Sequence, residues 1–426
     1  MLSNVGYIRG RGQQFLVAPS VFRNPLAITR AQLAGVQSSA VNGTNDGLTF
    51  YGADTPRFNG AAQRLLIGGQ RTNGIRNPRQ EGAAVGNPGT SPTNMGRNIS
   101  GGMTQGEIVA IGADQGLPYV DYRITGTVAS GTGIWALALE GTTSIPALTG
   151  QTWTGSWFWR LVDVVSGGPS AWSMIVTEAD SGGALVLENT VSMTAPTTAS
   201  LGSQRVSGTQ LLSGGASVAF VRTRVRLSFP VGTHDITIRI AVPQLEQGPF
   251  ASSPILPPAG TPGASTRGAD IVGASLSSLG IAANGACTIL WHGVVPVFLP
   301  SGNIHTIACI DNGSAPSSFN LLIATNSGTL EILRFNGGGA QQTVGAVTVN
   351  TTFKTGITLN GAGRAAASLN GGAVAAVTGG PTSGLTQFRL GNISDTFAPM
   401  WGETGRLRIL PYSVSDAELQ SLVGAL

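Results

Sequence analysis

Charge and cysteine are both scarce in this 426-residue chain, and each scarcity excludes a class of protein. Charged residues make up 10% of the sequence, against a usual quarter. Because hydrophobic residues still reach 41%, the bulk of the chain is not intrinsically disordered, a state that needs low hydrophobicity. The two cysteines, Cys287 and Cys309, are too few for a disulfide framework or a zinc site. We expect two buried thiols, although a bridge between them is left open.

Long apolar runs are missing as well. A membrane-spanning helix needs about 18 uninterrupted apolar residues, and the most apolar segment, residues 289–300, is broken by His292 and Pro296. The first residues lack the basic start and apolar core of a secretory signal. We therefore expect neither a membrane span nor signal-dependent export.

Glycine and short alternating segments are what the chain does contain. It has 62 glycines, about twice the average share, without the repeat at every third position that collagen requires. In residues 220–229, apolar side chains alternate with polar ones, the period of a half-buried strand. Many such segments with intervening turns predict an all-β protein with two antiparallel β-sandwich, or jelly-roll, domains after an extended, loop-rich N-terminal segment.

Composition shifts divide the chain into four parts. Prolines concentrate between the two series of strand signals and indicate a connector. At the far end, Ser415 and Glu418 have the spacing of a capping box, which predicts a short terminal helix. The predicted parts are an N-terminal attachment segment (1–80), a first sandwich (81–256), a proline-rich linker (257–270) and a second sandwich with the helix (271–426).

The net charge of +4 is unevenly distributed. Residues 1–80 carry nine arginines and two acidic residues, a net +7, and the remainder carries 15 basic and 18 acidic residues, a net −3. Such asymmetry indicates that the basic part meets a partner. Because the arginines are scattered, docking on an acidic protein surface fits as well as or better than nucleic acid, which we do not expect as a partner. The candidate attachment residues are Arg9, Arg11, Arg23 and Arg30.

Catalytic motifs are absent from the sequence. The three histidines (His234, His292 and His305) form no metal-binding or general-base arrangement, so packing roles are expected. Neither a nucleophile elbow nor a phosphate-binding loop occurs. We therefore expect no enzyme, with a glycan hydrolase as the minor alternative.

A glycan hydrolase would need two carboxylates roughly 5–10 Å apart. The nearest candidates are Glu178 with Asp180 and Glu107 with Asp114, and neither pair has a supporting signature.

Tryptophans are candidates for sugar contact, because sugar faces stack on aromatic rings. Trp172 follows a turn at residues 167–170, and Trp401 lies beside Gly402 after Pro399, so both could reach a loop. For the other tryptophans, packing in the core is the expected role.

The only cationic row in the body of the chain is formed by Arg222, Arg224 and Arg226, which share one side of a predicted strand. Arginine pairs bidentately with anions, so the row is a candidate site for acidic glycan. The alternative is a solvated face, or pairing with an acid such as Asp163 on a neighbouring strand. No cofactor is expected. Calcium is left open at a weak site around Asp311, where a plain turn is the commoner explanation.

Several short motifs follow one another in order along the chain, at residues 27–30, 55–58, 65–67, 70–73, 76–82, 116–119, 151–154, 243–255 and 265–270. Together they resemble motifs of bacteriophage tail and fibre proteins. At the far end, residues 405–409 and 415–419 resemble the last strand and helix of concanavalin-like or laminin-G-like sandwiches.

This resemblance implies a virion protein of a phage or a gene transfer agent, a tail fibre or a head spike, with a carbohydrate-binding-module-like sandwich and a concanavalin-like one. It implies a homo-oligomer, assembled in the host cytoplasm, that other virion proteins hold through residues 1–80. The predicted function is adhesion to host surface polysaccharide. The alternatives are a purely structural tail-tip or capsid decoration protein and, less favoured, a polysaccharide depolymerase.

Overall fold

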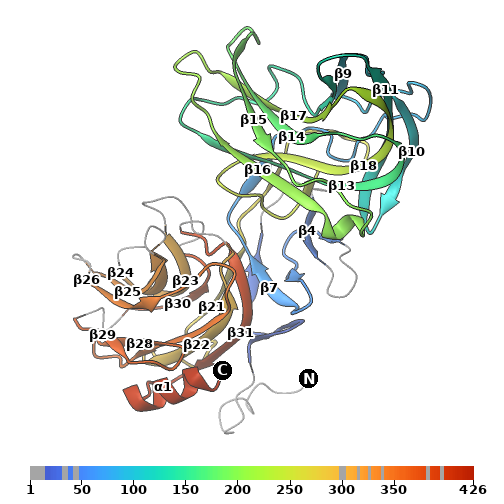
Figure 1. Ribbon diagram of the computed structural model, residues 1–426. Helices are drawn as coiled ribbons and strands as arrows, with labels where there is room; N and C mark the ends of the chain where they lie inside the picture. Colours follow the sequence, from blue (N-terminus) through green and yellow to red (C-terminus); the bar gives the residue numbers. More distant parts are fainter. Residues whose placement is uncertain are drawn as a thin grey trace. The chain divides into compact units, whose positions relative to one another are not determined.

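Strands dominate the computed structural model (Figure 1), so the prediction of an all-β fold is confirmed. The structure describes residues 15–30, 37–41, 48–296, 304–313, 317–324, 328–336, 340–379, 384–393 and 398–426. In these ranges every strand pairing between named elements is antiparallel, and α1 (Asp416–Gly424) is the only α-helix. None of the described helices has the length and apolarity that a bilayer crossing needs.

The chain forms two compact units that are interleaved along the sequence. Unit 1 comprises Met1–Ala31, Ala53–Gln70 and Gly268–Leu426, and unit 2 comprises Gln32–Gly52 and Arg71–Arg267. The described part of the basic N-terminal segment therefore contributes strands to both units.

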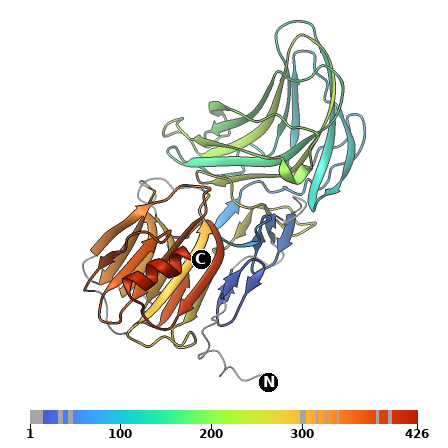
Figure 2. The same cartoon turned by 60° about the horizontal axis from the view of Figure 1, so that its bottom comes forward.

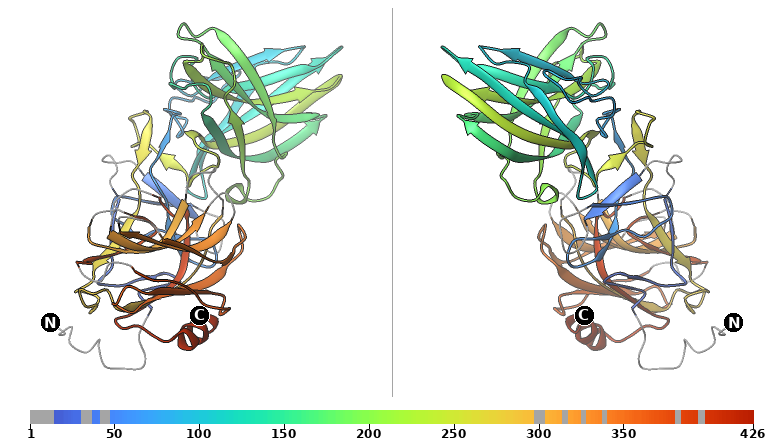
Figure 3. Two further views of the ribbon diagram at one scale, coloured as in Figure 1. Left: turned by 90° about the vertical axis from the view of Figure 1, so that its left-hand side faces the viewer. Right: turned by 90° about the vertical axis from the view of Figure 1, so that its right-hand side faces the viewer.

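Unit 2 is a sandwich of two five-stranded sheets, whose layers can be followed in Figure 3. The first sheet has the order β10-β11-β18-β13-β16 and the second has the order β15-β14-β17-β12-β9. The strands are β9 (Gly96–Ser100), β10 (Glu107–Asp114), β11 (Leu117–Val128), β12 (Gly133–Ala138), β13 (Thr152–Ser166), β14 (Ala171–Ala179), β15 (Leu185–Ser192), β16 (Arg205–Leu211), β17 (Phe220–Phe229) and β18 (Gly232–Gln247).

Alternation along β17 explains how the sandwich closes. Val221, Val225 and Leu227 are fully buried, while the arginines between them point to the other side of the sheet. The buried sides of both sheets meet in one core that includes Trp157 and Trp159. These two tryptophans are therefore packing residues, as expected.

Smaller sheets complete unit 2. β4 (Gln37–Val41) pairs with β5 (Leu48–Tyr51) and with β19 (Ile255–Leu256). β8 (Arg71–Asn73) pairs with β20 (Ser265–Arg267). The proline-rich stretch therefore ends on a strand of this unit.

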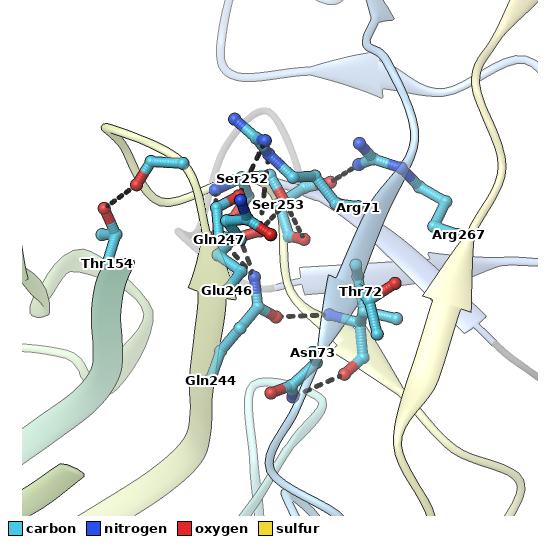
Figure 4. A network of polar contacts seen from close by, with 12 residues as sticks. Arg71, Thr72, Asn73, Thr154, Gln244, Glu246, Gln247, Ser252, Ser253 and Arg267 are labelled. Atoms are coloured by element: carbon cyan, nitrogen blue, oxygen red, sulfur yellow. Dashed lines mark hydrogen bonds and ion pairs between the residues drawn. The ribbon is translucent and has the colours of Figure 1, made fainter. Parts of the chain in front are cut away.

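Side chains of the motif at residues 243–255 fix the segment that follows β18 and leads to β19 (Figure 4). The buried carboxylate of Glu246 accepts hydrogen bonds from the Ser252 backbone N–H (2.5 Å) and hydroxyl (2.7 Å). Gln244 accepts one from the backbone N–H of Ile255 (2.9 Å), and Arg267 donates to the Ser253 hydroxyl (2.7 Å). Buried polar groups need hydrogen-bond partners, and these side chains find theirs within the motif and on Arg267. The motif therefore has a structural role in the chain.

Unit 1 contains two larger sheets. The first has the order β2-β1-β31-β22-β27-β28-β29, with β7 on β31 and β6 on β7, and the second has the order β26-β25-β24-β23-β30-β21-β3. The strands are β1 (Val17–Ala18), β2 (Val21–Phe22), β3 (Ala27–Thr29), β6 (Phe58–Asn59), β7 (Arg64–Ile67), β21 (Ile271–Ser275), β22 (Cys287–Val294), β23 (Ile304–Asp311), β24 (Ser317–Ala324), β25 (Thr329–Asn336), β26 (Ala340–Ala346), β27 (Phe353–Leu359), β28 (Ala365–Leu369), β29 (Ala375–Val377), β30 (Gln387–Leu390) and β31 (Gly402–Leu410).

The helix α1 covers the sheet that contains β22 and β27 (Figure 2). Its Leu419 and Val423 pack on Leu290 of β22. The Ser415 hydroxyl accepts a hydrogen bond from the backbone N–H of Glu418, so the predicted N-cap is confirmed. Cys287 is on β22, in this sheet.

Neither cysteine forms a disulfide, and both are buried. Cys287 lies on β22 and Cys309 on β23, which belong to different sheets of unit 1. The expectation of two buried thiols is confirmed.

Candidate functional site

The predicted cationic row exists as a surface on unit 2, which we call the arginine face. It lies on the outer side of the sheet that contains β17, opposite the core. The register pairs Arg222 with Thr177, Arg224 with Ile175 and Arg226 with Ser173, all on β14. On the next strand, β15, the outer side carries Glu188, Thr190 and Ser192, and all three are exposed.

The arginine side chains lie across β14. Arg224 on β17 forms an ion pair with Glu188 on β15, two strands away, so its stem must cross the strand between them. Ile175 is fully buried although it points outward. The aliphatic stems of the arginines explain this burial, because long cationic side chains cover apolar surface while their charged ends stay near solvent.

Among the described residues, Glu188 is the only carboxylate that forms ion pairs with the row. Glu188 pairs with Arg224 and lies 3.8 Å from Arg226 Nη1. In the described part of the chain, no ion pair joins Arg222 to a carboxylate. Burial, followed by the neighbouring charge of Arg224, lowers the pKa of Arg222, and Glu188 opposes this shift. The acid that pairs with the row is thus Glu188 on β15. Asp163, the example of an acidic partner in the alternative interpretation, lies on β13 in the other sheet.

The Nε atoms of the three arginines are buried and have no hydrogen-bond partner among the described residues. A buried donor without a partner is costly. Because these Nε atoms are buried, the row offers a ligand its unbalanced charge rather than these donors.

The outer side of the other sheet of unit 2 gives an internal comparison. Three arginines there meet four carboxylates, and each arginine has at least one carboxylate within 3.8 Å. The pairs are Arg123 with Asp235 and Glu107, Arg239 with Asp121 and Asp114, and Arg160 with Asp114. The two faces of one sandwich thus differ in charge balance, and the arginine face has an excess of two positive charges.

The acid pairs considered for hydrolysis have structural partners. Glu178 accepts hydrogen bonds from the backbone N–H groups of Ser213 and Gly214. Glu107 and Asp114 belong to the paired face described above.

The two candidate tryptophans have different surroundings. Trp172 is half-buried, and its ring packs edge-on against Trp159 with centroids 5.2 Å apart. Trp401, in unit 1, is 8% exposed. A Cβ on Gly69 would lie 2.5 Å from its Cζ2, so only glycine fits beneath this ring. In this structure both rings are packed against neighbours.

The other predicted residues are placed as follows. Arg9 and Arg11 lie outside the described residues, and Arg23 is exposed. Arg30 is fully buried and pairs with Asp270. Particle attachment through this segment stays a prediction.

The weak calcium candidate has a cationic partner. The Asp311 carboxylate accepts hydrogen bonds from Arg389 Nε (2.8 Å) and from the backbone N–H of Gly313 (2.7 Å). Within the described ranges no cluster of acidic, histidine or cysteine side chains could hold a metal ion. Of the histidines, His234 is buried and bonds the backbone of Gly168 and Pro230.

Sequence reasoning missed a pocket of about 470 Å³ at one edge of the sandwich in unit 2. It is formed by Trp159 of β13, the end of β15, the segment 193–204 and the start of β16. Its residues are up to 48 positions apart, from Trp159 to Ser207, so no local pattern could have indicated it.

Comparisons with known proteins give remote likenesses. No family model and no curated protein matches the chain. The carbohydrate-binding module CBM40 of a Ruminococcus gnavus IT-sialidase is 18% identical, with a TM-score of 0.28 over 33% of this chain and 84% of that one. The NanB sialidase of Streptococcus pneumoniae is 13% identical, with a TM-score of 0.28 over 35% of this chain and 26% of that one.

A third solved structure spans more of the chain. The tandem CBM22 domains of Xyn10C from Paenibacillus barcinonensis are 11% identical, with a TM-score of 0.24 over 77% of this chain and 96% of that one. At such TM-scores these likenesses assign neither a family nor a ligand to the chain.

Proposed function

We propose that unit 2 binds an acidic polysaccharide through the arginine face. The observation that carries this proposal is the charge imbalance of that face, where Arg222, Arg224 and Arg226 share the single carboxylate of Glu188. Like charges in such a row repel one another, whereas Arg123, Arg160 and Arg239 on the other sheet each pair with a carboxylate. An anionic ligand supplies the missing negative charge.

The chemistry of the face suits an acidic sugar. Guanidinium groups donate two parallel hydrogen bonds to a carboxylate or sulfate, and their planar faces can stack on the apolar side of a sugar ring. The exposed hydroxyls of Thr190 and Ser192 lie alongside. The face is shallow, so we expect weak single sites whose strength comes from several copies acting together.

Binding to defined polymers tests the proposal. We expect the protein to bind polygalacturonate, which carries a carboxylate on every sugar, and not the neutral polymer dextran. The affinity should fall as salt is raised, because exposed charges are screened. Biolayer interferometry over a salt series measures both effects. Equal binding of the two polymers contradicts the proposal. Binding of neither polymer also contradicts it and favours a purely structural protein. New reducing ends after incubation would instead indicate a depolymerase.

We further propose that the protein works as an adhesin on a phage-like particle, as a homo-oligomer held by its N-terminal end. The motif resemblance and the +7 charge of residues 1–80 support this role. Attachment by the N-terminal segment cannot be tested by deleting the whole of that segment. β1, β3 and β7 belong to unit 1, so removing the whole segment would damage the fold.

Deleting residues 1–14 removes Arg9 and Arg11 and no described strand. We expect this variant to keep its polygalacturonate affinity but to be lost from assembled particles, because two of the attachment charges are gone. Electron microscopy of purified particles, with immunoblotting for copy number, measures the loss. Normal incorporation of the shortened chain would contradict attachment through this end.

A further inference from the structure

The pocket at the edge of unit 2 offers polar groups that have no other use in the described residues. The hydroxyls of Ser192, Thr194 and Ser207 line it. Trp159 also lines it, and its Nε1 is buried without a hydrogen-bond partner. Several small apolar groups, Ala195 among them, complete the wall. This mixture of hydroxyls, an aromatic ring and methyl groups matches the surface of a sugar ring.

The segment that forms the wall is held in place before any ligand arrives. The side-chain oxygen of Gln204 accepts hydrogen bonds from the backbone N–H (2.6 Å) and the hydroxyl (2.9 Å) of Thr197. Its side-chain nitrogen donates to the carbonyls of Thr197 (3.0 Å) and Ala199 (2.7 Å). A preformed pocket loses little entropy on binding.

Arg205 is the only charged residue that lines the pocket. Its guanidinium donates to the Ser156 hydroxyl (2.9 Å) and lies over the ring of Phe158, so it is held against the sheet. Burial lowers the pKa of Arg205 to about 10, so the side chain is still cationic at neutral pH. The other residues of the wall are neutral, and an uncharged sugar can fit against them without a charged partner.

The strand register joins the pocket to the arginine face. Ser192, on the pocket wall, pairs with Ser173 on β14, and Ser173 pairs with Arg226 on β17. Neighbouring strands lie about 4.8 Å apart, so this row places the pocket wall about 10 Å from the backbone of the nearest arginine. One oligosaccharide can span that distance.

We infer that the pocket takes a neutral sugar residue, a hexose or N-acetylhexosamine, from the same polysaccharide whose acidic residues bind the arginine face. This inference rests on the proposed function and sharpens it. The ligand is then a mixed polymer that carries both acidic and neutral sugars, rather than an acidic homopolymer. Charge on the face gives attraction, and the pocket gives selectivity.

Two oligosaccharides of equal length separate these contributions. A hyaluronan hexasaccharide alternates glucuronate with N-acetylglucosamine, and a hexagalacturonate is acidic throughout. We expect wild-type protein to bind the hyaluronan fragment at least as tightly, although it has half the carboxylates. Ala199→Trp, which fills the pocket from an exposed position, should weaken only the hyaluronan fragment, by about tenfold, the scale of a single well-fitted pocket group.

The matched control is Thr198→Trp, because Thr198 is exposed next to Ala199 but does not line the pocket. We expect it to leave both affinities unchanged. If Ala199→Trp weakens neither ligand, or weakens both equally, the inference is wrong.

A second readout separates failure of the pocket from failure of the arginine face. The chain has seven tryptophans, so the indole N–H signals are few, and Trp159→Phe identifies the one from Trp159. Millimolar N-acetylglucosamine alone should shift this signal, in wild type and equally in Arg222→Ala/Arg226→Ala. A shift without any polymer binding would support a sugar site in the pocket and overturn the proposed function. Polymer binding without a shift would overturn the inference that the pocket binds a sugar.

Discussion

Replacing both Arg222 and Arg226 by alanine should lower the affinity of the protein for polygalacturonate about a hundredfold. A hydrogen bond to a charged group contributes about 1.5–3 kcal/mol, so each lost arginine costs roughly tenfold or more. Arg224 remains in this variant because it pairs with Glu188, which would otherwise lose its partner. Biolayer interferometry at low salt measures the loss, and the slope of affinity against salt should become shallower.

Three further variants make this prediction specific to the arginine face. Arg123→Ala, on the charge-paired sheet, should leave the affinity unchanged. Glu188→Gln should raise the affinity at low salt, because it removes the only carboxylate of the row. Lysine at positions 222 and 226 should give an intermediate loss, since lysine keeps the charge without the bidentate geometry. An unchanged affinity in the alanine variant, or an equal loss in Arg123→Ala, would show that binding lies elsewhere.

Replacing Asp270 by alanine should destabilise unit 1 by about 3–5 kcal/mol, the usual cost of breaking a buried ion pair from one side. The Asp270 carboxylate accepts hydrogen bonds from Arg30 Nε (2.5 Å), Arg57 Nη2 (2.6 Å) and the backbone N–H of Gly68 (2.9 Å). All three charged side chains are fully buried. Without the carboxylate, two buried guanidinium groups would lose the negative charge that Asp270 supplies.

Urea denaturation followed by tryptophan fluorescence measures this effect. Trp291 and Trp401 belong to unit 1, and the other five tryptophans belong to unit 2. The part of the fluorescence transition that comes from these two residues reports unit 1. The matched control is Asp416→Ala, which breaks the exposed pair with Arg364 in the same unit and should cost at most about 1 kcal/mol. Equal midpoints for the two variants would contradict a special role for Asp270.

The arginine face shows how far local pattern carries a prediction. Alternation along residues 220–229 correctly separates the buried side chains from the arginines, because a strand turns successive side chains to opposite sides whatever it packs against. The acid that meets Arg224 was not predictable in the same way. Glu188 lies 36 residues away on β15, and only the strand order of the sheet brings it close.

The basic segment shows the opposite case. Its composition indicates loops and free charge, yet Arg30 is buried against Asp270, 240 residues along the chain. Burial of an arginine depends on finding a counter-charge in the folded protein, and composition does not contain that information. Removing the whole segment, residues 1–80, would therefore remove strands of unit 1.

The sequence by itself determined the class of fold, the alternating faces of the strands and the cap at Ser415, because each depends on neighbouring residues and on backbone geometry. Only the tertiary structure decided which charges are neutralised, which aromatic rings are packed and where a pocket opens. Those properties depend on contacts between residues far apart in the chain. The excess charge of the arginine face is therefore a property of the folded sandwich in unit 2, and not of the basic composition of the chain.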